Sequence, residues 1–483
     1  MSDTPIIVWF RRDLRLADHP ALCAAVAQGR AIVPCFILDE AATGTWRAGG
    51  ASRWWLHGSL DALGRSIAGK GGRLVLRRGD TAKTLIALAA ETGAKDVYAS
   101  RAFEPWASRL EHDVRHALSE EGITFKRFGG TLLHDPDQLT TQSGGPFKVY
   151  TPFWRALSQR AAIGRALPAP AKLISPAQVP KSDALAAWRL RPAKPDWAAG
   201  LREAWNPGEQ GAQDSLTRFL DDALADYKEM RNRPDRAGTS RLSPHLAFGE
   251  ISPRQCWSAV EAAGAHQGRG SDSGRETFLK ELAWREFSAH LLHHVPTLPD
   301  QPFRKEFAAF PWRRDAAGLQ AWQRGLTGYP IVDAGMRELW ATGWMHNRVR
   351  MIVASFLIKD LLLPWQAGEA WFWDTLVDAD LANNAASWQW VAGSGADAAP
   401  YFRIFNPVTQ GRTFDPAGAY VRRWVPEIAA LDDDAIHAPW EASAGAMAAA
   451  GVQLGTTYPA PIVDHAEARR AALVALECVK ASR

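Results

Sequence analysis

The residues best suited to chemistry lie between Gly343 and Trp390, where charged, amide and indole groups interrupt a strongly apolar sequence. On helices, a spacing of four residues would gather them on two faces, one with Asn347 and Met351 and one with Asp380, Asn384 and Trp388. A buried polar group without a partner costs about 1–3 kcal/mol. A helical core explains any one of these residues, but together they favour a pocket for a large, flat ligand with polar edges.

A second candidate is a phosphate-binding turn at Gly238–His245. Ser243 followed by Pro244 predicts a helix start, with Ser243 as N-cap and Pro244 at the first helical position. The preceding residues add hydroxyls, a flexible backbone and the Arg241 guanidinium, which suit a diphosphate at a helix N-terminus. Ser252-Pro253 repeats the signal. Many helices begin this way without binding a ligand, so an ordinary helix start is the alternative.

Two further segments combine aromatic and charged groups. Glu281, Trp284 and Arg285 would share a helical face, unless they are only an exposed Glu–Arg pair beside a core tryptophan. Residues 401–410 mix an arginine, amides and aromatic rings in a loop-like sequence. Such a mixture suits phosphate positioning and the reading of an unstacked base.

The first 130 residues alternate short apolar strands with amphipathic helices. Strands are predicted at Ile6–Phe10, Ala31–Leu38, Arg73–Arg77, Asp96–Ser100 and Thr124–Phe128. Helices are predicted between them at Pro20–Ala27, Ser52–Ala68, Thr81–Glu91 and Pro105–Glu120. This alternation predicts a doubly wound parallel sheet, whose ligands usually lie beyond the carboxyl ends of its strands. The basic and aromatic run Trp9–Arg15 would lie at that edge or form a solvated loop.

The rest of the chain reads as a connector followed by helices. Prolines and glycines predict an interdomain connector over 131–206, within which Val149–Trp154 looks ordered and partly buried. Helical periodicity dominates 207–483. We therefore predict an α/β domain at 1–130, the connector at 131–206 and a large all-α domain at 207–483.

Composition excludes several classes of protein. The 483 residues are 47% hydrophobic and 22% charged, as in a folded globular protein. No apolar run could span a membrane and no signal peptide is apparent, so we expect a cytoplasmic protein, associated with the nucleoid if it is bacterial. Four separated cysteines predict neither disulfides nor a metal site. The net charge of +4 permits a local basic face, and the 22 tryptophans exceed what core packing usually needs.

At these motifs the chain resembles the photolyase/cryptochrome family over nearly its whole length. The resemblance begins at Trp9-Phe-Arg-Arg-Asp-Leu-Arg-Leu and continues through Thr239-Ser-Arg-Leu-Ser and Glu281-Leu-Ala-Trp-Arg-Glu-Phe. It is strongest over Gly343–Arg350, Asp378–Trp390 and Ala399–Pro407. Within the family the chain is most similar to the photolyases that repair cyclobutane pyrimidine dimers.

The resemblance implies that the helical domain holds FAD. The expected cofactor-binding residues are Tyr227, Thr239, Ser240, Arg241, Leu242, Ser243, Arg285, Asp378, Asp380 and Asn384. Asn384 would face the flavin N5, where plant cryptochromes usually carry an acid and animal ones a cysteine. Trp388, Trp365 and Trp312 occupy the family's electron-relay positions, from the flavin to the surface. The family often binds a second, antenna chromophore, and Phe103-Glu-Pro-Trp106 favours a deazaflavin or flavin over a folate.

The resemblance also implies ultraviolet-damaged DNA as the partner of a monomeric enzyme that uses light. The residues expected to contact the lesion and DNA are Arg231, Glu281, Trp284, Asn347, Arg348, Met351, Trp390, Arg403 and Gln410. Photolyases for (6-4) photoproducts place two histidines near Asn347, whereas this chain has only His346, followed by an amide. The alternatives are a flavin photoreceptor of the cryptochrome type and a (6-4) photolyase.

Overall fold

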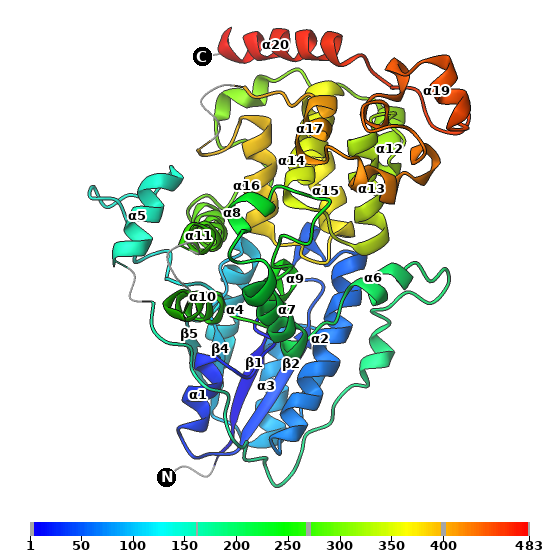
Figure 1. The fold of residues 1–483 in the computed structure, drawn as a ribbon. Helices are drawn as coiled ribbons and strands as arrows, with labels where there is room; N and C mark the ends of the chain where they lie inside the picture. The colour runs from blue at the N-terminus through cyan, green and yellow to red at the C-terminus, as the bar shows by residue number, and fades with distance from the viewer. Residues whose placement is uncertain (1–3, 161–162, 267–271, 398–401, 482–483) are drawn as a thin grey trace. The chain divides into compact units, whose positions relative to one another are not determined.

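The computed structural model describes residues 4–160, 163–266, 272–397 and 402–481 (Figure 1). The chain divides into two compact units. The first unit contains Met1–Ala225, Ser240–Pro296 and Val377–Asp380, and the second contains Asp226–Thr239, Thr297–Leu376 and Leu381–Arg483. Both units combine segments that are distant in sequence, and the division into 1–130, 131–206 and 207–483 stays a prediction.

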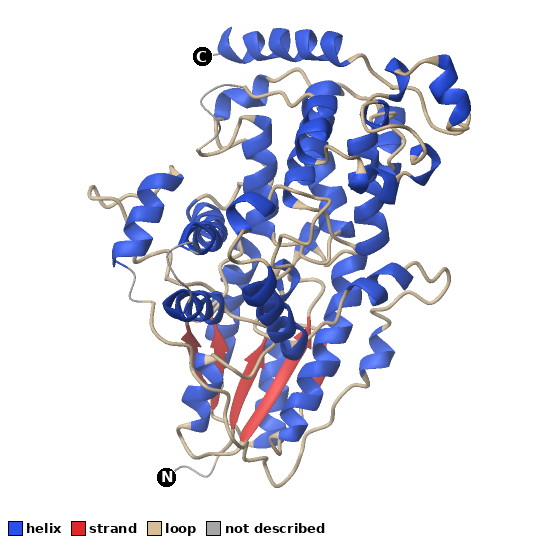
Figure 2. Ribbon diagram, in the orientation of Figure 1, coloured by secondary structure: helices blue, strands red, loops and turns tan. Residues whose placement is uncertain are grey.

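Five parallel strands form the sheet of the first unit, drawn in red in Figure 2. They are β1 (Ile6–Phe10), β2 (Ile32–Leu38), β3 (Val75–Arg78), β4 (Asp96–Ser100) and β5 (Thr124–Phe128). Their order is β3-β2-β1-β4-β5, with Ile6 paired with Ile32 on one side and with Asp96 on the other. The chain therefore winds in both directions from β1, which confirms the predicted doubly wound α/β fold.

One face of this sheet is buried against helices. Ile7 and Trp9 of β1 belong to a core cluster with Leu85 and Leu88 of α3 and Val114 of α4. Helix α1 packs against strands β1, β4 and β5. Buried parallel strands need helical cover because their apolar side chains project to both faces, and the sequence supplies it between successive strands.

The described helices of the first unit include the four that are predicted between the strands. They are α1 (Pro20–Val26), α2 (Gly50–Gly69), α3 (Thr81–Thr92), α4 (Pro105–Glu120), α5 (Tyr150–Arg160), α6 (Ala199–Ala204), α7 (Glu209–Asp222), α9 (Ser243–Ala247), α10 (Pro253–His266) and α11 (Asp272–His294), with short 3-10 turns at Gly44–Trp46 and Leu185–Trp188. Helix α5 lies beside α11. The Val149–Trp154 segment is ordered and partly buried as predicted, since Tyr150 and Phe153 are buried.

The described part of the second unit is helical. Its elements are α8 (Tyr227–Met230), α12 (Ala316–Arg324), α13 (Pro330–Thr342), α14 (Asn347–Ser355), a π-helix (Phe356–Asp360), α15 (Trp365–Thr375), α16 (Leu381–Ala392), α17 (Pro407–Phe414), α18 (Ala419–Trp424), α19 (Ala444–Ala449) and α20 (His465–Ala481), with 3-10 turns at Lys305–Ala309, Pro426–Ile428, Ala435–His437 and Pro439–Glu441. The predicted large helical domain is confirmed. Residue 401, the first of the predicted 401–410 segment, lies outside the described residues.

One of the two predicted helix starts is wrong by a residue. Helix α9 begins at Ser243, so Leu242 is its N-cap, without a side-chain hydrogen bond, and Pro244 is the second helical residue rather than the first. Ser252 does cap α10: Gln255 N donates to Ser252 Oγ at 2.9 Å, and Ser252 N donates to Gln255 Oε1 at 2.9 Å. This reciprocal pair is a capping box.

The basic run after β1 is not a solvated loop. Arg12 donates from Nε to Ala247 O and from Nη2 to Ala379 O, both at 2.7 Å. Arg15 is buried and donates to Gly249 O at 3.0 Å. These guanidinium groups hold main-chain carbonyls of distant segments of the first unit.

Among the described residues, no helix is long and apolar enough to cross a membrane. The same residues contain no group of three or more histidine, cysteine, aspartate or glutamate side chains that could hold a metal ion. All four cysteines are free thiols.

Candidate active site

The N-terminus of α14 presents the first group of predicted site residues. Helix α13 ends at Gly343, whose φ of 67° is left-handed and suits glycine. Helix α14 then begins at Asn347, where His346 Nδ1 accepts from Arg348 N at 3.2 Å. Asn347 is exposed and Met351 half-buried, one helical turn apart. The predicted common face of these two side chains is confirmed.

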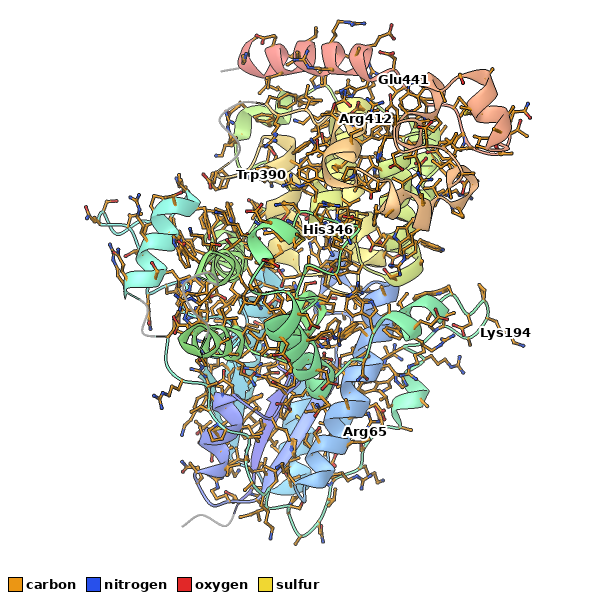
Figure 3. The ribbon with its side chains drawn as sticks, in the orientation of Figure 1. Arg65, Lys194, His346, Trp390, Arg412 and Glu441 are labelled. Carbon is orange, nitrogen blue, oxygen red and sulfur yellow. The ribbon has the colours of Figure 1, made fainter. Side chains whose placement is uncertain are left out.

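His346 is a neutral, buried support for this helix start. Burial, together with repulsion by Arg348 and Arg350, lowers the pKa of His346 to about 3. Since Nδ1 accepts a hydrogen bond, the proton lies on Nε2, which is buried and has no partner among the described residues. Glu338 Oε2 accepts from His346 N at 3.3 Å and from the Tyr420 hydroxyl at 2.7 Å. Figure 3 labels His346 on its segment of the second unit.

Arginines gather around the first turn of α14. Arg348 donates from Nη2 to Asn232 Oδ1 at 2.7 Å, and its guanidinium lies 4.3 Å from the centre of the Phe414 ring. Burial lowers the pKa of Arg348, and repulsion by Arg231 and Arg403 lowers it further. Arg231 and Arg403, the other two arginines predicted to contact DNA, thus lie near enough to Arg348 to repel its charge. Like charges held together in this way attract an anion.

Two other predicted lesion-contacting residues of the second unit lie on α16 and α17. Trp390 is half-buried on α16 and is labelled in Figure 3. Gln410 lies on α17, and its Oε1 is buried without a partner among the described residues. A buried amide oxygen of this kind can accept a hydrogen bond from a ligand.

Helix α16 carries Asn384 and Trp388 one turn apart, as predicted. Asn384 is buried and donates from Nδ2 to Glu369 O at 3.0 Å, which fixes the orientation of its amide. Burial raises the pKa of the Glu369 carboxyl to about 9, with the charge of Asp300 adding to the shift. The expectation that Asp380 shares this helical face is wrong, because α16 begins at Leu381.

Three buried or partly buried tryptophans lie in the second unit at the predicted relay positions. The Trp388 ring packs so closely on α15 that a Cβ on Gly368 would lie 2.1 Å from it. Trp365, the first residue of α15, is 2% exposed. Trp312 is partly buried, with its ring centre 4.3 Å from that of Phe310. Trp388 therefore lies against the first turns of the helix that Trp365 begins.

Helix α11 of the first unit carries Glu281, Trp284 and Arg285 within two turns, as predicted. All three side chains are half-buried. Arg285 donates from Nη1 to Thr131 O at 3.2 Å, with Glu286 Oε1 at 3.3 Å from the same atom. The Arg285 guanidinium is thus oriented by a segment that the sequence assigns to the connector.

The predicted cofactor-binding residues are distributed over both units. Tyr227, Thr239 and Asn384 belong to the second unit, and Ser240, Arg241, Leu242, Ser243, Arg285, Asp378 and Asp380 belong to the first. Arg241 has a left-handed φ of 52°, and its guanidinium lies 4.2 Å from the Trp205 ring centre. Asp378 is buried and Asp380 half-buried, in a segment that Arg12 holds through Ala379 O.

Four residues near these side chains were not predicted as site residues. Asn232 holds Arg348, Glu369 orients Asn384, His346 caps α14, and Tyr150 covers Trp284 with a parallel ring. Only His346 has a local signal, as the residue before a helix start. The other three act on partners far away in sequence, which no periodicity reveals.

Two family models match the chain. Residues 278–478 match the FAD binding domain of DNA photolyase, and residues 6–172 match the DNA photolyase family. The match to the first model includes the part of α11 from residue 278 onward and all of α14, α15 and α16, which together carry ten of the 22 predicted site residues.

Known proteins are similar over nearly the entire chain. The deoxyribodipyrimidine photo-lyase of Agrobacterium fabrum is 52% identical over 480 residues, covering 99% of both chains. Cryptochrome-1 of Arabidopsis thaliana is 40% identical over 96% of this chain and 69% of its own length. A solved class III photolyase from Agrobacterium tumefaciens has a TM-score of 0.95 at 52% identity, covering 100% of this chain and 98% of its own. An archaeal photolyase from Sulfolobus tokodaii, solved with two FAD molecules, has a TM-score of 0.82 at 28% identity over 98% of this chain and 99% of its own.

Proposed function

This chain belongs to the DNA photolyase family, and we propose that the side chains described above carry out light-driven repair of cyclobutane pyrimidine dimers in DNA. The protein is a flavoprotein lyase that uses FAD. The observation that supports the residue assignment best is the start of α14, where Asn347, Arg348 and Met351 emerge beside two further arginines. An amide can hydrogen-bond the edge of a base, and an apolar side chain can pack against its ring. A cluster of arginines can bind the flanking phosphates.

The chain fits FAD at several points. Asn384 donates from Nδ2 to Glu369 O, and its Oδ1 would accept from a flavin N–H. Asp378, Asp380 and Arg285 supply acceptors and donors for the ribityl chain and the ring edge. Tyr227 and the segment Thr239–Ser243 would hold the phosphates. FAD, when bound and fully reduced, supplies an electron after absorbing light.

The lesion would be held by side chains that read the base and exclude water. Trp284, Trp390 and Met351 would each supply apolar contacts to a dimer lifted from the stack, and lifting costs less for a damaged base than for a paired one. Glu281 and Asn347 would hydrogen-bond the thymine edges and stabilise the charge that develops when the dimer accepts an electron. The two carbon–carbon bonds of the cyclobutane ring would then break, and the DNA would give the electron up again, so that it is neither oxidised nor reduced overall.

Several finer features are also proposals. Trp388, Trp365 and Trp312 would pass electrons from the surface towards the cofactor. The protein would act as a monomer in the cytoplasm, near DNA. A second chromophore, a deazaflavin or flavin, would serve as antenna; the S. tokodaii neighbour, solved with two FAD molecules, supports this proposal.

One experiment separates repair from the alternatives. The protein, with its flavin reduced chemically, is incubated with oligothymidylate that carries cyclobutane dimers, in the light and in the dark. We expect dimers to disappear only in the light. A flavin photoreceptor, an option raised by the similarity to cryptochrome-1, would leave the dimers intact under light. An oligonucleotide with a (6-4) photoproduct should also remain unrepaired, since one histidine, not two, lies at Asn347.

Replacing Trp284 by alanine should reduce the preference for damaged DNA. Stacking of a base on an aromatic ring contributes about 1–3 kcal/mol, and the undamaged duplex does not use this contact. We expect affinity for a dimer-containing oligonucleotide to fall at least about fivefold, while affinity for the undamaged duplex changes little. Equal losses on both DNAs, measured by fluorescence anisotropy, would contradict the role of Trp284 in binding the lesion.

Replacing Arg348 by alanine should, unlike Trp284→Ala, affect binding to any DNA. A guanidinium that contacts a phosphate adds affinity on any sequence and about one unit to the slope of log K against log salt. We expect Arg348→Ala to lower the affinity for both damaged and undamaged DNA and to lower that slope by about one unit. Arg470→Ala on α20 is the matched control, because Arg470 is an exposed arginine of the same unit and should leave the slope unchanged.

A further inference from the structure

The connector after β5 forms hydrogen bonds with α11 at successive points. Arg285 donates to Thr131 O, and Glu286 Oε2 accepts from Leu133 N at 2.8 Å. Further along, Phe147 N donates to His290 Nε2 at 3.0 Å. The segment from Thr131 to Phe147 is thus held to the same helix that carries Trp284.

This attachment ends in a stacked pair of aromatic rings. Tyr150, the first residue of α5, lies with its ring centre 3.7 Å from that of Trp284, and the two planes differ by 4°. The Tyr150 hydroxyl donates to Lys280 O at 2.6 Å, one turn before Trp284 on α11. Tyr150 is only 9% exposed. The hydrogen bond fixes one end of the tyrosine, so its ring cannot slide along the indole.

A third ring closes the arrangement from the side. Phe287 meets Tyr150 edge-on at 5.9 Å and Trp284 edge-on at 5.8 Å, and it is 2% exposed. The indole is therefore covered on one face and bounded along an edge. A ligand base can reach Trp284 only from the opposite face or the remaining edge.

We propose that Tyr150 is a positioning residue that holds the Trp284 indole in the plane needed to receive a flipped pyrimidine dimer. The inference rests on the proposed role of Trp284 in binding the lesion. A preorganised ring binds its ligand more tightly because it loses no rotational freedom on binding. Tyr150 does not touch the substrate; it sets the orientation of the side chain that does.

The test compares variants of the intact flavin-bound protein. Tyr150→Leu removes the flat ring, and Tyr150→Phe keeps it but removes the hydroxyl. We expect Tyr150→Leu to weaken binding of a dimer-containing oligonucleotide about tenfold, with undamaged DNA and the salt slope unchanged. Tyr150→Phe should stay within about threefold of the parent, because the stack remains and one hydrogen bond contributes modestly.

A double variant distinguishes positioning from simple packing. If Tyr150 acts through Trp284, then Tyr150→Leu should cost nothing further in preference for damaged DNA when Trp284→Ala is already present. Additive losses would overturn the proposal. The proposal would also be overturned if Tyr150→Leu kept the preference for damaged DNA while Trp284→Ala lost it. That outcome would leave the proposed lesion role of Trp284 standing. An unchanged preference in Trp284→Ala would overturn the lesion role of Trp284 and this proposal together. Tyr150→Met, which fills the site without a flat ring, decides the question if Tyr150→Leu does not fold.

Discussion

Replacing Asp378 and Asp380 together by alanine should yield a protein that purifies largely without FAD. Asp378 is buried and Asp380 half-buried, and both belong to the short segment Val377–Asp380. We assign these carboxylates to hydroxyl and N–H groups of the cofactor. Without them, those ligand groups would leave water without gaining new partners, which costs about 1–3 kcal/mol for each group. The measurement is the ratio of flavin absorbance to protein absorbance after purification.

Loss of the cofactor should also lower the stability of the protein. A ligand at 100 times its dissociation constant stabilises the native state by about 2.7 kcal/mol, and the double variant would forfeit that contribution. Thermal unfolding with and without added FAD measures it. The parent should be stabilised by added FAD, and the double variant should show no shift.

Two controls separate the role of these carboxylates from general damage. Asp374→Ala removes an exposed carboxylate only four residues before Asp378 and should retain FAD. The double variant Asp378→Asn with Asp380→Asn keeps the side-chain shape while removing the charge. It should retain more cofactor than the double alanine variant. A flavin-replete alanine double variant would mean that other side chains hold FAD.

Local patterns predicted those parts of the molecule that depend on neighbours in sequence. The five strands follow from apolar runs between turn residues, and the common faces of Asn347 with Met351 and of Asn384 with Trp388 follow from helical spacing. The errors at Ser243 and Asp380 are both a single residue at a helix start. Helix ends are set by local dihedral angles, and these depend on tertiary contacts that hydrophobic spacing does not encode.

The contacts that orient the site were beyond such patterns because they join distant segments. Arg348 and Asn232 are 116 residues apart in sequence, and the amide of Asn384 is held by the main chain of Glu369, 15 residues before it. The ring of Tyr150 covers Trp284 from a segment that composition assigns to a linker. A main-chain acceptor in particular has no sequence signature, since every residue offers one.

Trp365→Phe should leave repair intact but abolish the photoreduction of oxidised flavin. Trp365 is assigned the middle position of a relay that carries electrons through the protein, with Trp388 nearest the cofactor and Trp312 nearest the surface. Phenylalanine keeps an aromatic ring in a site that is 2% exposed, so folding and FAD content should be largely preserved. It is, however, much harder to oxidise than an indole. Repair needs reduced flavin but not the relay, so a protein reduced chemically beforehand should split dimers normally.

The measurement is flavin absorbance under illumination with an external electron donor, alongside repair by the chemically reduced protein. Trp322→Phe is the informative control, because Trp322 is also buried and meets the Trp388 ring edge-on at 6.2 Å. It should still be photoreduced if electrons pass through Trp365. If Trp365→Phe is photoreduced at the parent rate while Trp322→Phe is not, electrons reach Trp388 from the Trp322 side instead. Trp322 would then be the residue that passes electrons to Trp388. Trp365 and Trp312 would not be part of the relay.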